Sequence, residues 1–158
     1  MKMTARDLLG RILMSLTAAE VGIIPFLVDV SPSHIFNPAW PAHARLHGIW
    51  LLVTGGLLSL VALYLIWFRR EDRRAAVTMA GVLLGCILAG FFTAISTVSM
   101  YGGSIGVDAA TATTQGLPSA DTGTGIPGNV RIFAIALLAL LIGVVLARGA
   151  AARETRQS

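Results

Sequence analysis

All three histidines of the chain fall within residues 34 to 50, in the run HIFNPAWPAHARLHGIW. Two of them, His43 and His47, are four residues apart, which places their side chains on one face of a helix. An imidazole ring gains and loses a proton near neutral pH and is also a common metal ligand. The run therefore holds groups that could act as general acid and base or bind a metal ion.

Two carboxylates precede this run inside an apolar segment. Glu20 lies near the middle of the segment and Asp29 near its end, and Pro25 between them is expected to kink the helix. An ionised carboxylate at that depth is costly unless it faces other helices, so such residues are candidates for function as well as for structural hydrogen bonds. For proton transfer, the candidate catalytic residues are Glu20, Asp29, His43 and His47.

Three other side chains are candidates for contact with a substrate. Trp50 and Thr54 continue the helical face of the histidine pair. Arg131 enters the last apolar segment, where it could hold an anionic group or form an ion pair with a carboxylate of the first segment. We expect these side chains to surround a polar pocket at one end of the helices.

Metal binding is an alternative to proton transfer. His34, His43 and His47 are candidate ligands of Zn or Fe, with a carboxylate completing the site. The glutamate of the HExxH zinc motif is absent, because residues 44–46 are Ala, Arg and Leu. The sequence therefore leaves the metal alternative open.

The same run also has the features of a corner between two helices. Asn37 and Pro38 are a turn signal, and Pro41 suits the first turn of a helix. Trp40 is typical of a membrane–water interface. Arg45 points away from the histidines and is expected to meet lipid headgroups. A purely structural corner is the third alternative.

Composition indicates a membrane protein. Of the 158 residues, 55% are hydrophobic and only 13% are charged, against about a quarter charged in soluble domains. The net charge of +4 does not indicate nucleic-acid binding, because the basic residues lie at the ends of apolar segments. A single cysteine, Cys86, excludes an intrachain disulfide.

Four apolar segments are long enough to cross a bilayer as helices of about 20 residues. They cover about residues 8–28, 41–68, 76–100 and 127–147. The first is expected to be an uncleaved helix, because its apolar run is too long for a signal peptide. The sequence therefore predicts an all-α fold, with residues 1–158 as one membrane domain of four transmembrane helices.

Basic residues predict the orientation of these helices. Ten of the 12 Lys and Arg residues lie before or at the start of the first segment, between the second and third, or after the fourth; the exceptions are Arg45 and Arg131. The positive-inside rule then places both termini in the cytoplasm, in a multi-pass protein of the cell inner membrane. The histidines and residues 101–126 would face outward, the latter as a connector or a lid.

Small residues predict how the helices pack. Gly81, Gly85 and Ala89 are spaced four apart in the third segment, and the second contains Gly55 and Gly56. Because such residues allow close approach of helices, we expect them to join the second and third segments. One face of the third segment could line a polar cavity with Thr93, Ser96, Thr97 and Met100.

Residues 34–50 resemble the signature of a family of small four-helix membrane proteins from bacteria and fungi, most of them uncharacterised. Its pattern is similar to Asn-Pro-x-Trp-Pro-x-His-Ala-x-x-His. The resemblance implies the four-helix layout and brings no activity with it. The matching residues are Asn37, Pro38, Trp40, Pro41, His43, Ala44 and His47.

These observations predict a small membrane enzyme. It would act on a lipophilic small molecule by acid/base or metal-assisted chemistry, in an outward-facing pocket of histidines and carboxylates. The alternative is a non-catalytic membrane subunit, or a protein that binds or transports a small molecule, with structural histidines. The expected partners are membrane lipid, a lipophilic small molecule and a second copy of the chain, and not nucleic acid.

Overall fold

The computed structural model of the chain describes residues 3–69, 71–106 and 126–154, and these contain helices but no strand. The predicted all-helical fold is confirmed over these residues. Most of the predicted loop of residues 101–126 lies outside them. The helices are α1 (Ala5–Gly22), α2 (Ile24–Asp29), α3 (Ala42–Trp67), α4 (Arg73–Ser96), the short 3₁₀ helix η1 (Val98–Met100) and α6 (Gly128–Glu154).

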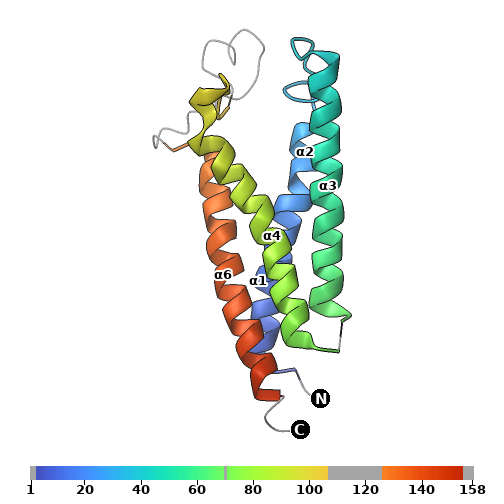
Figure 1. Cartoon of the computed structure of the whole chain (residues 1–158), viewed down its shortest axis with the longest axis vertical. Helices are drawn as coiled ribbons and strands as arrows, with labels where there is room; N and C mark the ends of the chain where they lie inside the picture. Colours follow the sequence, from blue (N-terminus) through green and yellow to red (C-terminus); the bar gives the residue numbers. More distant parts are fainter. Residues whose placement is uncertain (1–2, 70, 107–125, 155–158) are drawn as a thin grey trace.

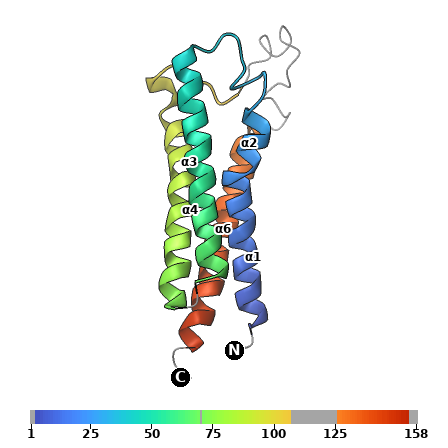
Figure 2. The same ribbon diagram turned by 90° about the vertical axis from the view of Figure 1, so that its right-hand side faces the viewer.

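Four helical segments are long and apolar enough to cross a membrane. They are α1 with α2, then α3, α4, and α6 as far as Gly149. Each lies antiparallel to the next along the chain, and α1 contacts α3 and α6, which in turn both contact α4 (Figures 1 and 2). We call the end where α1 begins and α6 ends the terminal end. The opposite end, with residues 31–41 and the start of α3, is the motif end.

The most extensive contact between two helices joins α1 and α6, which approach each other through glycine. A Cβ atom at Gly10 would lie 2.7 Å from the backbone N of Ala147 and 2.8 Å from the carbonyl O of Gly143. Closer to the motif end in the same interface, the buried Thr17 hydroxyl donates a hydrogen bond to the carbonyl of Ala136 at 3.2 Å. Small residues and an interhelical hydrogen bond are typical of membrane helix contacts.

The glycines of α3 and α4 serve different interfaces from the one predicted. Gly55 packs on the Val21 carbonyl of α1, whereas Gly81 faces Val144 of α6. Although α3 and α4 are neighbours as expected, these two glycines do not join them. The reason is that spacing shows which residues share a helix face but not which neighbour that face meets.

Pro25 divides the first apolar segment as predicted. α1 ends at Gly22 and α2 begins at Ile24, with Pro25 in the first turn of α2. Proline has no N–H to donate to the carbonyl four residues earlier, which is that of Val21. That carbonyl lies against Gly55 of α3, where no side chain blocks it. The break therefore coincides with a close contact between α1 and α3.

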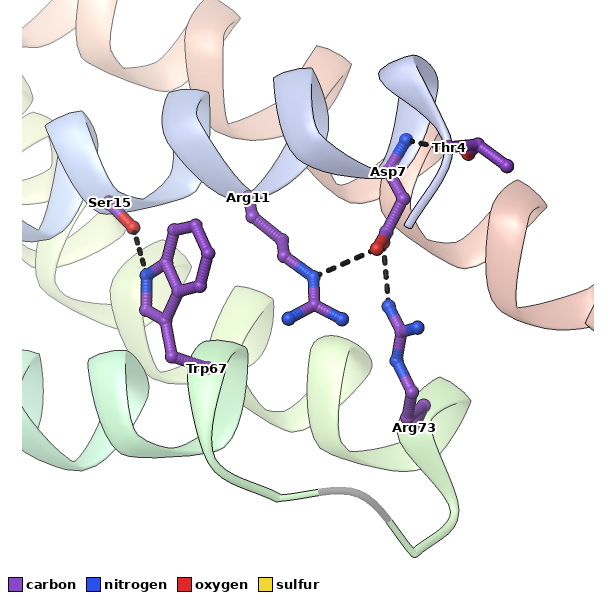
Figure 3. A network of polar contacts seen from close by, with 6 residues as sticks. All are labelled: Thr4, Asp7, Arg11, Ser15, Trp67 and Arg73. Atoms are coloured by element: carbon purple, nitrogen blue, oxygen red, sulfur yellow. Dashed lines mark hydrogen bonds and ion pairs between the residues drawn. The ribbon is translucent and has the colours of Figure 1, made fainter. Parts of the chain in front are cut away.

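A buried charged cluster joins α1 and α4 at the terminal end (Figure 3). The Asp7 side chain has no exposed surface, and its Oδ1 accepts a hydrogen bond from Arg73 Nη2 at 2.6 Å. Its Oδ2 is 3.0 Å from Arg11 Nε, without hydrogen-bond alignment, so that contact is an ion pair. The Thr4 hydroxyl caps α1 by accepting from the Asp7 N–H.

The same cluster extends to the end of α3. The Arg11 guanidinium lies 5.5 Å from the ring centre of Trp67, a cation–π distance. The Trp67 indole N–H donates to the Ser15 hydroxyl at 2.9 Å (Figure 3). Three of the four long helices are thus joined by polar contacts at this end.

Candidate functional site

Residues 31–41 form the corner that leads from α2 into α3, and Asn37 lies at its centre. Its side chain is nearly buried, and its Oδ1 accepts from the N–H of Ala39 at 2.9 Å, which closes a turn around Pro38. Its backbone carbonyl accepts from Arg45 Nη2 at 3.0 Å. Arg45 is half-buried and holds the corner to the helix, and its expected contact with lipid headgroups stays a prediction.

A second contact seats the corner on α3. Ile35 is 4% exposed, and a Cβ atom at Gly48 would lie 2.5 Å from its Cδ1 atom. Gly48 therefore leaves the space that Ile35 fills. Pro41 lies just before the helix, which starts at Ala42, within one residue of the predicted start. The corner thus fixes where α3 begins and how it is rotated.

This rotation sets the direction of the two motif histidines. The Nε2 atoms of His43 and His47 are 3.0 Å apart, and their rings are perpendicular with centres at 4.5 Å. The ring of Trp50 lies 5.8 Å from that of His47, so the three side chains share one face as predicted. However, His43 and His47 are exposed, as is Thr54, and Trp50 is 63% exposed. The face points away from the other helices, so these side chains line no pocket inside the bundle.

Asp29 and His34 form a separate polar group on the other side of the corner. Asp29 Oδ1 is 3.8 Å from His34 Nε2, an ion-pair distance that is too long for a hydrogen bond. On the other side of the ring, His34 Nδ1 hydrogen-bonds the Ser33 hydroxyl at 2.9 Å, and that hydroxyl contacts Ser31 at 2.9 Å. Sequence reasoning missed both serines, although Ser33 precedes His34 directly.

Glu20 and Arg131 are not brought together. Glu20 is half-buried on α1, and Arg131 is exposed near the start of α6. Among the described residues, neither side chain has a hydrogen bond or ion pair. The ion pair with a carboxylate, one of the two alternatives for Arg131, is therefore absent from the described part of the chain. Their catalytic and substrate-binding roles stay predictions.

The predicted metal ligands divide into two sets. Within the described ranges, no group of three His, Cys, Asp or Glu side chains could hold one ion. His34 therefore does not join His43 and His47 in a three-residue site. The histidine pair offers two nitrogen ligands on an exposed surface.

A shallow groove of about 450 Å³ lies between α4 and α6 in their motif-end halves. Thr93 and Ser96 contribute hydroxyls to it, whereas Thr97 and Met100 do not line it, so the groove is not the polar cavity that was predicted. Figure 1 shows α4 and α6 diverging there from α2 and the start of α3. The remaining lining residues are apolar: Gly85, Ala89, Phe92 and Leu137.

Comparison with known proteins assigns the chain to a family. Residues 13–150 match the profile of a family of unknown function (DUF6640). The chain belongs to this family. The match includes the corner, the histidine pair and the greater part of all four long helices of this DUF6640 protein. No curated protein and no solved structure matches the chain.

Proposed function

We propose that this DUF6640 protein binds a divalent transition-metal ion, Zn²⁺ or Fe²⁺, through His43 and His47 at the motif end of a membrane-embedded bundle. The observation that carries the proposal is the convergence of the two Nε2 atoms to 3.0 Å on an exposed face. Two nitrogens bound to tetrahedral zinc at ~2.05 Å are about 3.4 Å apart. The rings need to separate by only a few tenths of an ångström to accept the ion, which replaces the proton between them.

The packing of the corner supports this assignment. Asn37, Arg45 and Gly48 hold the corner to α3 without help from either imidazole. The two rings contact each other and Trp50, all on α3 itself. Because His43 and His47 are exposed and the corner is already complete, a ligand gives these two side chains a role that packing does not.

Charge distribution supports a metal site on the outer side of the membrane. At the terminal end, the described residues include Arg6, Arg11 and Arg74, whereas the motif end has Arg45 and Arg131. The positive-inside rule assigns the terminal end to the cytoplasm. The histidine pair would then meet metal ions from outside the cell membrane.

The test is metal binding by the full chain, purified in detergent with a tag that contains no histidine. We expect zinc affinity to fall by at least ~100-fold in His43→Ala and in His47→Ala, because loss of a ligand costs no less than loss of a residue that orients one. His34→Ala is the matched control and should bind as wild type does. Equal affinity in wild type and the His43→Ala/His47→Ala double variant would refute the proposal.

A second candidate function, acyl transfer from a lipophilic small molecule, is favoured by the contacts of His34. We propose that Ser33 Oγ attacks the acyl carbonyl while His34 Nδ1 takes its proton and passes it to the leaving group, with Asp29 stabilising the imidazolium. A fluorophosphonate probe should then label wild-type protein and the Ser31→Ala control, but not Ser33→Ala. Labelling that is absent in wild type, or retained in Ser33→Ala, would contradict this candidate.

A further inference from the structure

We propose that two copies of the chain share one metal ion and pair along α3, an inference that rests on the proposed metal function. Within the described ranges, the pair His43 and His47 has no third His, Cys, Asp or Glu near enough to join it. Structural zinc sites have four protein ligands in a tetrahedron. Two copies provide four imidazole nitrogens, which complete the site without any further residue.

The exposed face of α3 that carries His43 and His47 continues along the helix toward the terminal end. Its side chains follow one another at alternating spacings of four and three residues, the pattern by which parallel helices pack in coiled coils. Every one of them is exposed, from 49% at Val61 to 71% at Phe68 among the large apolar ones. This surface, the α3 stripe, consists of His43, His47, Trp50, Thr54, Leu57, Val61, Tyr64 and Phe68.

Membrane orientation brings the two histidine pairs to the same height. Two copies inserted in the same direction are related by a two-fold axis along the membrane normal, so their α3 helices run parallel. In that arrangement His43 and His47 of one copy lie opposite the same residues of the other. In an antiparallel pair over the full 26-residue helix, the two sites would lie about 19 residues apart along the axis, or about 28 Å at 1.5 Å per residue.

The composition of the α3 stripe indicates that the metal drives the pairing. Membrane helices that associate through packing alone carry small residues at the contact. The α3 stripe instead carries Trp50, Tyr64 and Phe68, which hold backbones apart. Lipid can cover these apolar side chains, but it leaves the imidazole pair without a partner. We therefore expect the dimer to form with metal and to dissociate without it.

The stoichiometry of zinc binding tests the shared site separately from metal binding itself. For the full chain in detergent, free of a histidine tag, we expect 0.5 zinc per chain, coordinated by two residues from each of two copies. Light scattering should show the protein mass doubling with zinc and returning to the monomer with chelator. One zinc per chain on a monomer would overturn the shared site and leave the proposed function standing. No zinc binding would overturn both.

Cross-linking tests which face of α3 is paired. In a Cys86→Ser background, Leu57→Cys lies on the α3 stripe, whereas Leu51→Cys is a control that is 70% exposed on another face. A short bis-maleimide should join Leu57→Cys chains with zinc several times more efficiently than Leu51→Cys chains, and chelator should abolish the difference. Equal cross-linking at the two positions, or no effect of zinc, would overturn pairing along the α3 stripe.

Discussion

The two ends of the bundle use polar side chains in opposite ways. At the terminal end, Asp7 is fully buried and two arginines, Arg11 and Arg73, contact its two oxygens. At the motif end, His43 and His47 are exposed, and among the described residues their hydrogen-bond and ring contacts are with each other and with Trp50 of the same helix. Buried polar groups that have partners hold helices together. Exposed groups whose ligand atoms converge contribute little to the stability of the folded monomer. The terminal end therefore has the contacts of a stabilising cluster, and the motif end carries the proposed ligand site.

Removal of the buried carboxylate should have the largest effect on stability. Asp7→Asn removes the buried carboxylate that both Arg11 and Arg73 contact, and breaking a buried ion pair from one side costs about 3–5 kcal/mol. We expect that loss in the free energy of unfolding, measured by reversible SDS unfolding in mixed micelles. Zinc binding at the other end should change little in the fraction that remains folded.

Glu71→Gln is the matched control for Asp7→Asn. Glu71 pairs with Arg69 at 3.3 Å, but its side chain is 86% exposed. Exposed ion pairs contribute about 0–1 kcal/mol, so unfolding should be nearly unchanged. Equal losses in the two variants would mean that burial does not distinguish the Asp7 cluster from a surface pair.

The next effect concerns the contact between α1 and α6 near the terminal end. Gly10→Ala places a methyl group against backbone atoms of Ala147 and Gly143, which cannot rotate away. Overpacking of this kind costs about 1–3 kcal/mol. Gly90→Ala is the control, because nothing lies within 4 Å of a Cβ atom there, and alanine favours a helix. If Gly10→Ala were as stable as Gly90→Ala, α1 and α6 would not be in close contact.

At the motif end, Asn37→Ala should have an intermediate effect on both stability and metal binding. It removes the acceptor for the Ala39 N–H in a nearly buried turn, at a cost of about 1–2 kcal/mol. It also loosens the corner that sets the rotation of α3, so zinc affinity should fall as well. Asn37→Asp keeps the acceptor oxygen, so its free energy of unfolding and its zinc affinity should both fall less than those of Asn37→Ala. Unchanged zinc affinity in Asn37→Ala would show that the corner does not position the histidines.

The smallest expected effect on stability is that of the histidines themselves. His43→Ala should change the free energy of unfolding without metal by less than about 0.5 kcal/mol, as is usual for exposed positions. The same variant should lose zinc binding, which separates function from stability at this end. A loss of 2 kcal/mol or more in metal-free protein would instead make the pair structural and remove the contrast between the two ends.

The sequence predicted most of the fold because apolar length and helix breakers are local signals. The second apolar segment was expected over residues 41–68, and α3 covers Ala42–Trp67. The kink at Pro25 was predicted for the same reason. The shared face of His43 and His47 followed from helix geometry alone.

The direction of that face could not be predicted. Because α3 beyond its first turns is largely apolar on all sides, no contrast between polar and apolar faces indicates which side is buried. The role of Asp7 was missed because its partner Arg73 is 66 residues away and both look like surface charges in the sequence. Contacts between distant segments depend on the packing of whole helices, which local patterns do not record.

The Asp7–Arg73 contact has a consequence for synthesis of the chain. Asp7 leaves the ribosome with Arg11 close behind it, but Arg73 follows only after two apolar helices have been made. The contact between Gly10 and Gly143 forms later still, because Gly143 lies in α6. The first helix is therefore made early and meets its partner α6 last. A nascent chain that stops before residue 128 lacks Gly143 and Ala147, the residues against which Gly10 packs.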